Sequence, residues 1–254
     1  MHRKLTTLHS PNTLEIKELS INLASPLPTL VYFALSATNS LILDPFNQPV
    51  QFLLDEPIRL ISISLPDHHE NEDPNLAMNK WATRFKNDPH FFDRYVAECR
   101  EALFFLIDQG LIDQENLVLA GLSRGGYTAI RLAAESEIFN KVLAFAPLVD
   151  LESLSEFKEN LSKTFIEKNS LNVLIPKMIG KHIRIHIGNR DTRVGTKPAF
   201  LFVESLANIS YINGYRSPPV ELMITPSIGH KGHGTAQESF HQGALWVKKM
   251  ILRA

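Results

Sequence analysis

Residues 117–130 read Leu-Val-Leu-Ala-Gly-Leu-Ser-Arg-Gly-Gly-Tyr-Thr-Ala-Ile. An apolar run typical of a buried strand leads into Gly-x-Ser-x-Gly, and a segment with helical periodicity follows. Such a turn forces its serine into a strained conformation and needs glycine on both sides, because a Cβ would collide with the neighbouring strand and helix. The glycine patterns of dinucleotide and phosphate-binding loops are absent. The stretch therefore predicts Ser123 as a nucleophile that projects above the sheet.

Around this turn, β-branched or aromatic runs alternate with segments of helical period. Strands are expected at residues 30–35, 58–64, 117–120, 142–146, 183–187 and 220–225, and helices at residues 75–85, 93–109, 125–135, 198–208 and 236–252. The strands are near-continuous apolar runs, as expected where helices cover both faces of a sheet. Gly110 stands where a helix-ending glycine is expected, and Thr235 to Glu238 has the capping-box pattern that starts a helix. The alternation predicts the α/β class with a mostly parallel sheet.

The length of the chain suits one domain. The sequence has 254 residues, 44% of them hydrophobic, which is enough for a sizeable core. We therefore expect a single domain over residues 1–254. Residues 151–181 are rich in Leu, Glu, Lys and Ser and form either a small helical lid or an ordinary crossover with a longer loop.

Charge and composition exclude several partners. Lysine and arginine number 26 against 27 acidic residues, so no general attraction for nucleic acid is expected. No apolar run approaches the roughly 20 residues needed to span a bilayer, and the N-terminus lacks the pattern of a secretory signal. The single cysteine, Cys99, excludes an intrachain disulfide and is expected to pack in a helix. We expect a cytoplasmic protein.

A nucleophilic serine needs a base, and the base needs a carboxylate that orients it, in the chain order Ser, Asp, His for this arrangement. The predicted strand at 183–187 ends in Gly188, and the following loop presents Asp191. Asp150, which follows the preceding strand, is a weaker competitor. Asp191 is therefore the candidate acid.

Two histidines compete for the role of the base. The loop after residues 220–225 contains His230 and His233, each preceded by glycine. His233 is preferred because glycines flank it on both sides, although His230 has the shorter spacing from its strand. The His-x-x-His pattern also resembles a metal site, but it lacks nearby cysteines and the H-E-x-x-H spacing, so no metal or other cofactor is expected. His68 and His69 are expected in a solvated loop.

From about Leu30 onward the chain resembles the α/β-hydrolase superfamily. Residues 188–194 and 229–235 are similar to the acid and histidine loops of the branch that contains dienelactone hydrolase and prolyl oligopeptidase. The resemblance implies that Ser123 attacks an acyl carbonyl, that a histidine moves the protons, and that Asp191 orients this histidine. Water would then release the acyl group from the enzyme.

The oxyanion of this reaction requires two N–H donors. The amide of Arg124, directly after the nucleophile, is expected to be one. The second should follow the strand at 30–35, where many relatives have a His-Gly pattern and this chain has Ser36 and Ala37 instead. These two residues are the candidates for the second donor.

The leading functional hypothesis is hydrolysis of a small-molecule carboxylic ester with a short or medium acyl group. A peptidase or amidase of the prolyl-oligopeptidase type is the alternative, disfavoured by the absence of a propeller domain. A non-catalytic binding protein on the same fold is a third hypothesis. The Arg124 side chain could bind a substrate carboxylate or phosphate, although packing over the turn or pairing with an acid is preferred. Core packing is likewise preferred to a pocket-lining role for Trp81, Phe91 and Phe92.

Overall fold

The computed structural model describes residues 3–69 and 72–252. Its centre is an eight-stranded sheet with the order β1-β2-β4-β3-β5-β6-β7-β8. The strands are β1 (Lys4–Leu8), β2 (Ile16–Ser20), β3 (Leu27–Phe33), β4 (Arg59–Ile63), β5 (Ile112–Leu122), β6 (Lys141–Phe145), β7 (His182–Gly188) and β8 (Val220–Thr225). Strand β2 is antiparallel to both neighbours, and all pairs from β4 to β8 are parallel. The predicted fold class is confirmed.

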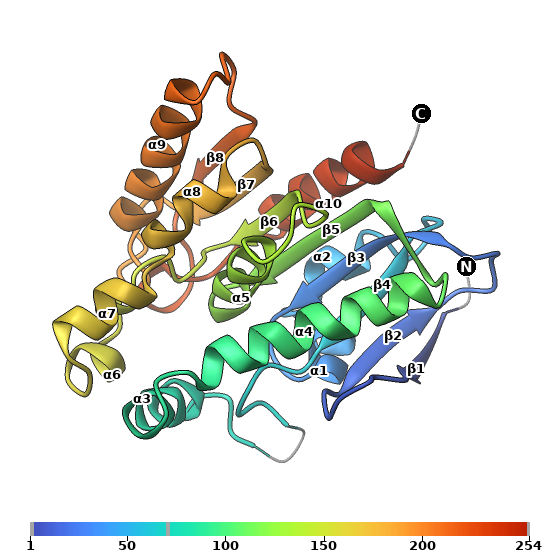
Figure 1. The fold of residues 1–254 in the computed structure, drawn as a ribbon, viewed down its shortest axis with the longest axis horizontal. Helices are drawn as coiled ribbons and strands as arrows, with labels where there is room; N and C mark the ends of the chain where they lie inside the picture. The colour runs from blue at the N-terminus through green and yellow to red at the C-terminus, as the bar shows by residue number, and fades with distance from the viewer. Residues whose placement is uncertain (1–2, 70–71, 253–254) are drawn as a thin grey trace.

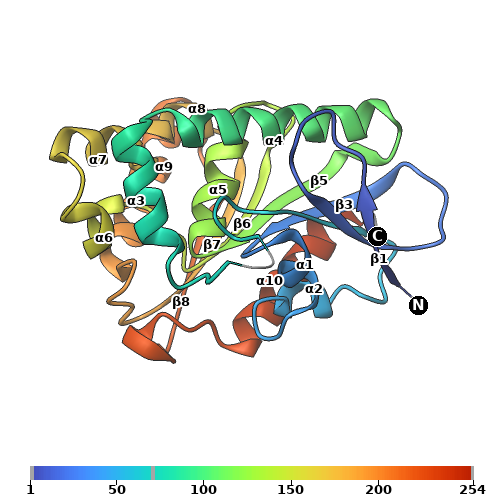
Figure 2. The same cartoon turned by 90° about the horizontal axis from the view of Figure 1, so that it is seen from below.

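Helices cover both faces of the sheet (Figures 1 and 2). One face carries α1 (Ala37–Ile42), α2 (Gln48–Gln51) and α10 (Gln237–Ile251). The other carries α3 (Ala77–Asn87), α4 (Phe91–Asp108), α5 (Arg124–Ala133) and α9 (Thr196–Ile212). Because parallel strands need crossover connections, this two-sided cover is the expected arrangement.

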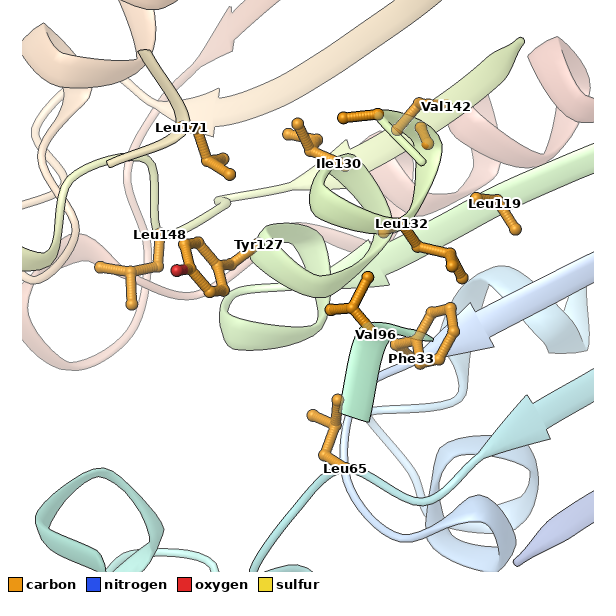
Figure 3. Close-up of a cluster of buried hydrophobic side chains, with 14 of the residues drawn as sticks. Phe33, Leu65, Val96, Leu119, Tyr127, Ile130, Leu132, Val142, Leu148 and Leu171 are labelled. Carbon is orange, nitrogen blue, oxygen red and sulfur yellow. The ribbon is translucent and has the colours of Figure 1, made fainter. Parts of the chain in front are cut away.

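Strand β3 shows how one sequence serves both layers. Val31 and Phe33 belong to the core beneath α4 and α5, whereas Leu30 and Tyr32 belong to the core beneath α10. Successive side chains of a strand point to opposite faces, so an uninterrupted apolar run fills two cores. Figure 3 shows Phe33 within the first core, together with side chains from β5, β6, α4 and α5.

Two predicted helix ends can be compared with the structure, and only one of them is confirmed. Gly110 follows the C-cap of α4, Gln109, and has a φ of +66°; its amide donates to the carbonyl of Ile107, as expected for a helix-ending glycine. The prediction of a capping box at Thr235 is wrong. Helix α10 begins after Ala236, and no side chain caps it.

Residues 151–181 form a chain of short helical pieces. They are the 3-10 turns Leu151–Ser153 and Leu171–Leu174 and the helices α6 (Ser155–Lys158), α7 (Lys163–Asn169) and α8 (Ile175–Met178). In Figure 1, α6 and α7 lie beside α3 at one end of the molecule. Among the described residues, no helix combines the length and hydrophobicity that crossing a bilayer would require.

Candidate active site

Ser123 lies in a sharp turn between β5 and α5. Its φ of 55° and ψ of −115° are rare for a residue with a side chain, and such conformations cost about 1–3 kcal/mol. A Cβ on Gly121 would lie 2.1 Å from the carbonyl oxygen of Gly125, and one on Gly125 would lie 1.9 Å from that of Phe33. The turn therefore accepts only glycine at both positions, and close packing maintains the strain at the serine.

Asp191 follows β7, and its carboxylate is fully buried. Its Oδ1 accepts hydrogen bonds from the amides of Arg193 (2.9 Å) and Val194 (3.0 Å). Burial raises the pKa of Asp191, but the hydrogen bond and charge of His233, together with these two amides, outweigh burial and lower the pKa overall. The residue is held as a carboxylate with Oδ2 directed at the histidine.

His233 joins the other two residues. Its Nδ1 lies 2.7 Å from Oδ2 of Asp191, and its Nε2 lies 2.9 Å from Oγ of Ser123. The preceding Gly232 has a φ of +71°, and a Cβ there would lie 2.3 Å from the carbonyl oxygen of Arg190. The histidine loop therefore packs directly against the acid loop, and this close approach sets the position of the imidazole.

The structure does not bring the two competing residues into this arrangement. His230 is exposed, and among the described residues only His233 provides a ring nitrogen within hydrogen-bonding distance of Ser123. The carbonyl of His230 instead accepts the amide of His233. Asp150 caps the turn at 151–153 by accepting the amide of Glu152.

Two cavities meet at Ser123 and His233. The first, of about 370 Å³, is mainly apolar; its other wall residues include Ala34, Leu35, Pro45, Phe46, Leu122, Ile228 and Phe240. The second, of about 230 Å³, is bounded by Pro74, Asn75, Met78, Leu148, Leu154 and Arg193. Arg124 contributes to both, and none of the described residues that line either cavity is acidic. A larger hollow of about 770 Å³ runs along α4, and its lining residues do not include Ser123, Arg124 or His233.

The loop after β3 differs from the expected oxyanion loop. Ser36 is fully buried and caps α1, and the amide of Ala37 donates to Oγ of Ser64 over 2.8 Å. Neither residue lines the apolar cavity, whereas Ala34 and Leu35 do. Strand β3 ends at Phe33, two residues before the predicted end, so the residues at the cavity also come two positions earlier. The amides of Ala34 and Leu35 share Oγ of Ser40 as acceptor, at 3.2 and 2.9 Å.

The aromatic candidates and the first histidine pair lie elsewhere. Trp81, Phe91 and Phe92 are buried and pack against one another edge-to-face or tilted in the core, consistent with the preferred interpretation. His68 is 2% exposed, so the expected solvated loop is wrong for this residue. Burial lowers the pKa of His68 to about 3, and Arg124 contributes to the same shift. Within the described parts of the chain, no group of three His, Cys, Asp or Glu side chains is placed to hold a metal ion.

The strand order, with only β2 reversed against its neighbours, and the nucleophile turn after β5 are those of a serine hydrolase with the α/β-hydrolase fold. Residues 80–252 match the sequence model of the prolyl oligopeptidase family. This match spans more than half of the chain, and the protein belongs to this family. No curated protein matched the sequence.

Solved structures support the fold. The protein TT1662 from Thermus thermophilus is 17% identical, with a TM-score of 0.69 and full coverage of both chains. An esterase from Pyrococcus furiosus is 15% identical, with a TM-score of 0.67 and coverage of 98% of this chain and 91% of the esterase. A puromycin-hydrolyzing peptidase from Mycobacterium tuberculosis is 14% identical, with a TM-score of 0.65 and coverage of 98% of this chain. The chain spans 39% of the length of that peptidase. It spans 35% of the length of a Bacteroides ovatus protein whose solved structure also matches.

Proposed function

We propose that the protein hydrolyses carboxylic esters through an acyl-enzyme, with Ser123, His233 and Asp191 as its catalytic triad. The observation that carries the proposal is the continuous chain of hydrogen bonds from Asp191 through His233 to Ser123. This chain ends on a hydroxyl that opens into both cavities. A substrate placed across Ser123 would have one cavity for each side of its scissile bond.

The reaction follows from the contacts of these three residues. Nε2 of His233 accepts the hydroxyl proton as Oγ of Ser123 attacks the carbonyl carbon, and the same nitrogen later protonates the leaving alkoxide. Asp191 fixes the tautomer in which Nδ1 carries a proton and stabilises the imidazolium. Water attacks the acyl-enzyme in the second half of the reaction, with His233 again as the base.

The negative oxygen of the intermediate needs fixed donors. Arg124 is the first residue of α5, where a backbone amide has no partner within its helix. We place the first donor there. The loop at Ala34 and Leu35 supplies the second, through an amide that now contacts Oγ of Ser40. Removing one such donor typically costs about 2.7–4 kcal/mol in the transition state.

The walls of the cavities favour an ester with at least one apolar group. A site that recognises the free amino terminus of a peptide needs acidic side chains to pair with the ammonium group. None of the described residues lining the two cavities is acidic, and the larger cavity is mainly apolar. Both features fit a neutral or anionic ester better than a peptide amine.

A peptidase is the second candidate. The family match and the likeness to the mycobacterial peptidase favour it. The triad mechanism is common to both activities, because an acyl-enzyme forms from an amide as well as from an ester. The substrates that the cavities accept therefore decide between the two.

Unactivated substrates distinguish an esterase from a peptidase. Activated p-nitrophenyl esters do not, because any reactive serine can cleave them. We expect the wild type to hydrolyse ethyl esters of short and medium fatty acids, followed by titration of the released acid, and Ser123→Ala to be inactive. Peptides and aminoacyl anilides should give a far lower kcat/KM. Peptide cleavage that equals or exceeds ester cleavage would assign a peptidase instead. A folded protein that turns over none of them would point to the binding protein.

We also propose that residues 151–181 are a fixed wall of a single domain rather than a mobile lid. Leu154 lines the smaller cavity, and Glu156 pairs with Arg193 of the acid loop. Phe157 is fully buried and packs edge-to-face on Phe85 of α3. These contacts tie the segment to the site on two sides.

A further inference from the structure

The smaller cavity is lined by two arginines, Arg193 and Arg124, which differ in whether a carboxylate pairs with them. Arg193 donates from Nη1 and Nη2 to the two carboxylate oxygens of Glu156, over 2.9 and 2.5 Å. Such a forked pair compensates both charges and uses the donors in a fixed geometry. Arg193 therefore adds little net charge to the cavity.

Arg124 has no such partner. Its Nη1 donates to the carbonyl oxygen of Pro74 over 3.1 Å. No carboxylate of a described residue lies within ion-pair distance of it, and among the described residues its other donors have no hydrogen-bond partner. Burial lowers the pKa of Arg124 to about 10; the charge of Arg193 adds to this effect, and the charge of Glu156 opposes it. The side chain is still a cation at neutral pH.

A cation that is partly removed from water and has no direct ion-pair partner lowers the stability of the fold. The cation follows the nucleophile directly in the chain and lines both cavities that meet at Ser123. A ligand that carries an anion would supply the missing counter-charge. The planar guanidinium fits a carboxylate especially well, because two parallel hydrogen bonds can form.

We propose, on the basis of the esterase function proposed above, that the natural substrate is an ester with a carboxylate on one side of the scissile bond. The carboxylate binds Arg124 in the smaller cavity, and the group on the other side of the bond is apolar and fills the larger cavity. The small volume of about 230 Å³ limits the anionic part to a short chain. The sequence alone favours packing over the turn or pairing with an acid for the Arg124 side chain; among the described residues, the structure pairs it with no acid.

A purely structural role for Arg124 makes a different prediction. Its bond to Pro74 could simply hold the segment before α3 in place. Loss of that support would impair all esters alike, whereas loss of an anion site impairs only the anionic ones. Arg124→Gln distinguishes the two roles, because glutamine retains a donor for the carbonyl without the charge.

The test uses two pairs of substrates, each a carboxylate and its neutral carboxamide of equal shape. Monoethyl glutarate and ethyl glutaramate vary the acyl side, and 4-butanoyloxybutanoate and its amide vary the alcohol side. In one pair we expect the wild type to prefer the carboxylate by about 10- to 100-fold in kcat/KM, the range of charge-assisted hydrogen bonds. The pair that shows the preference identifies which side of the bond Arg124 holds.

Arg124→Gln and Arg124→Met should abolish this preference, so that kcat/KM for the carboxylate falls about 10- to 100-fold relative to kcat/KM for the carboxamide of the same pair. Arg84→Gln is the matched control, because it removes the same charge from an exposed arginine on α3 that pairs with Asp67. Wild-type enzyme with no preference in either pair, or Arg124 variants that lose both members equally, would overturn the anion site. Turnover of the neutral esters would leave the esterase proposal intact, whereas no turnover of any ester would remove the esterase proposal itself.

Discussion

The two cavities that meet at Ser123 share this serine, Arg124 and His233 but differ in the rest of their walls. The larger is walled by aliphatic and aromatic side chains from the loop after β3, the turn between α1 and α2, the histidine loop and α10. The smaller is walled by α3, the acid loop and the segment 151–181, and it contains two arginines. In the proposed function, the shared residues perform the chemistry, and each wall selects the substrate group on its own side of the scissile bond.

The largest expected effect concerns the residues that both cavities share. His233→Ala should lower kcat by about 10³-fold or more for every substrate, because triad members act as a unit. His230→Ala removes a similar side chain three residues away, exposed and without a bond to Ser123, and should stay within a few-fold of the wild type. Steady-state kinetics with one short ester measures both. Equal losses in the two variants would refute the assignment of the base.

A smaller effect is expected from the apolar wall alone. Phe46 lines the larger cavity through its side chain, while its backbone carbonyl accepts the hydroxyl of Tyr32 and is unaffected by substitution. Phe46→Ala should lower kcat/KM about 10-fold for the longest ester that the wild type accepts, from loss of roughly 1–2 kcal/mol of apolar contact.

Acetate esters should be hydrolysed by Phe46→Ala as by the wild type, since they do not reach this wall. A profile of kcat/KM against chain length, measured on both proteins with Arg124→Gln beside them, gives the contrast. If Phe46→Ala lowered activity evenly at all lengths, the cavity would not be the binding site of the apolar group.

The smallest effect concerns the wall of the polar cavity and appears in stability. The hydrogen bonds from Arg193 lower the pKa of Glu156 from its ordinary 4.5 to about 2. Because the folded state has the lower pKa, the stabilisation is complete above pH 4.5 and is lost as the pH falls towards 2. Glu156→Gln should therefore cost about 1–2 kcal/mol of unfolding free energy at pH 7.

Urea denaturation at several pH values measures this difference, which should shrink steadily below pH 4.5. Glu159→Gln is a suitable control, since Glu159 is an exposed acid on the same segment. A difference that stays constant between pH 7 and pH 3 would show that the ion pair does not hold the segment to the acid loop.

The positions of Ser123 and Asp191, each shortly after the end of a strand, could be predicted from the sequence because both depend on local patterns. The glycines on both sides of Ser123 indicate close packing, and Asp191 follows a strand that the sequence pattern predicts. The histidines could not be separated in this way. Both follow glycine in one loop, and only the packing of Gly232 on Arg190, a tertiary contact, decides which imidazole reaches the serine.

Other differences between sequence and structure come from weak local signals. Ala34 and Leu35 continue the apolar run of β3, so the sequence predicts a strand that ends two residues later and places the oxyanion candidates after it, at Ser36 and Ala37. The first two strands were not predicted at all. Their sequences, KLTTL and IKELS, mix polar and apolar residues and gain their order mainly from pairing with a neighbour.

The central claim is that Ser123 is the activated nucleophile, and one measurement tests it most directly. The protein is treated with a fluorophosphonate probe, digested, and the adduct is located by mass spectrometry. We predict one adduct, on Ser123, that forms in the wild type and is absent from Ser123→Ala, with labelling slowed in His233→Ala. No adduct on Ser123 of the folded wild type would contradict the account.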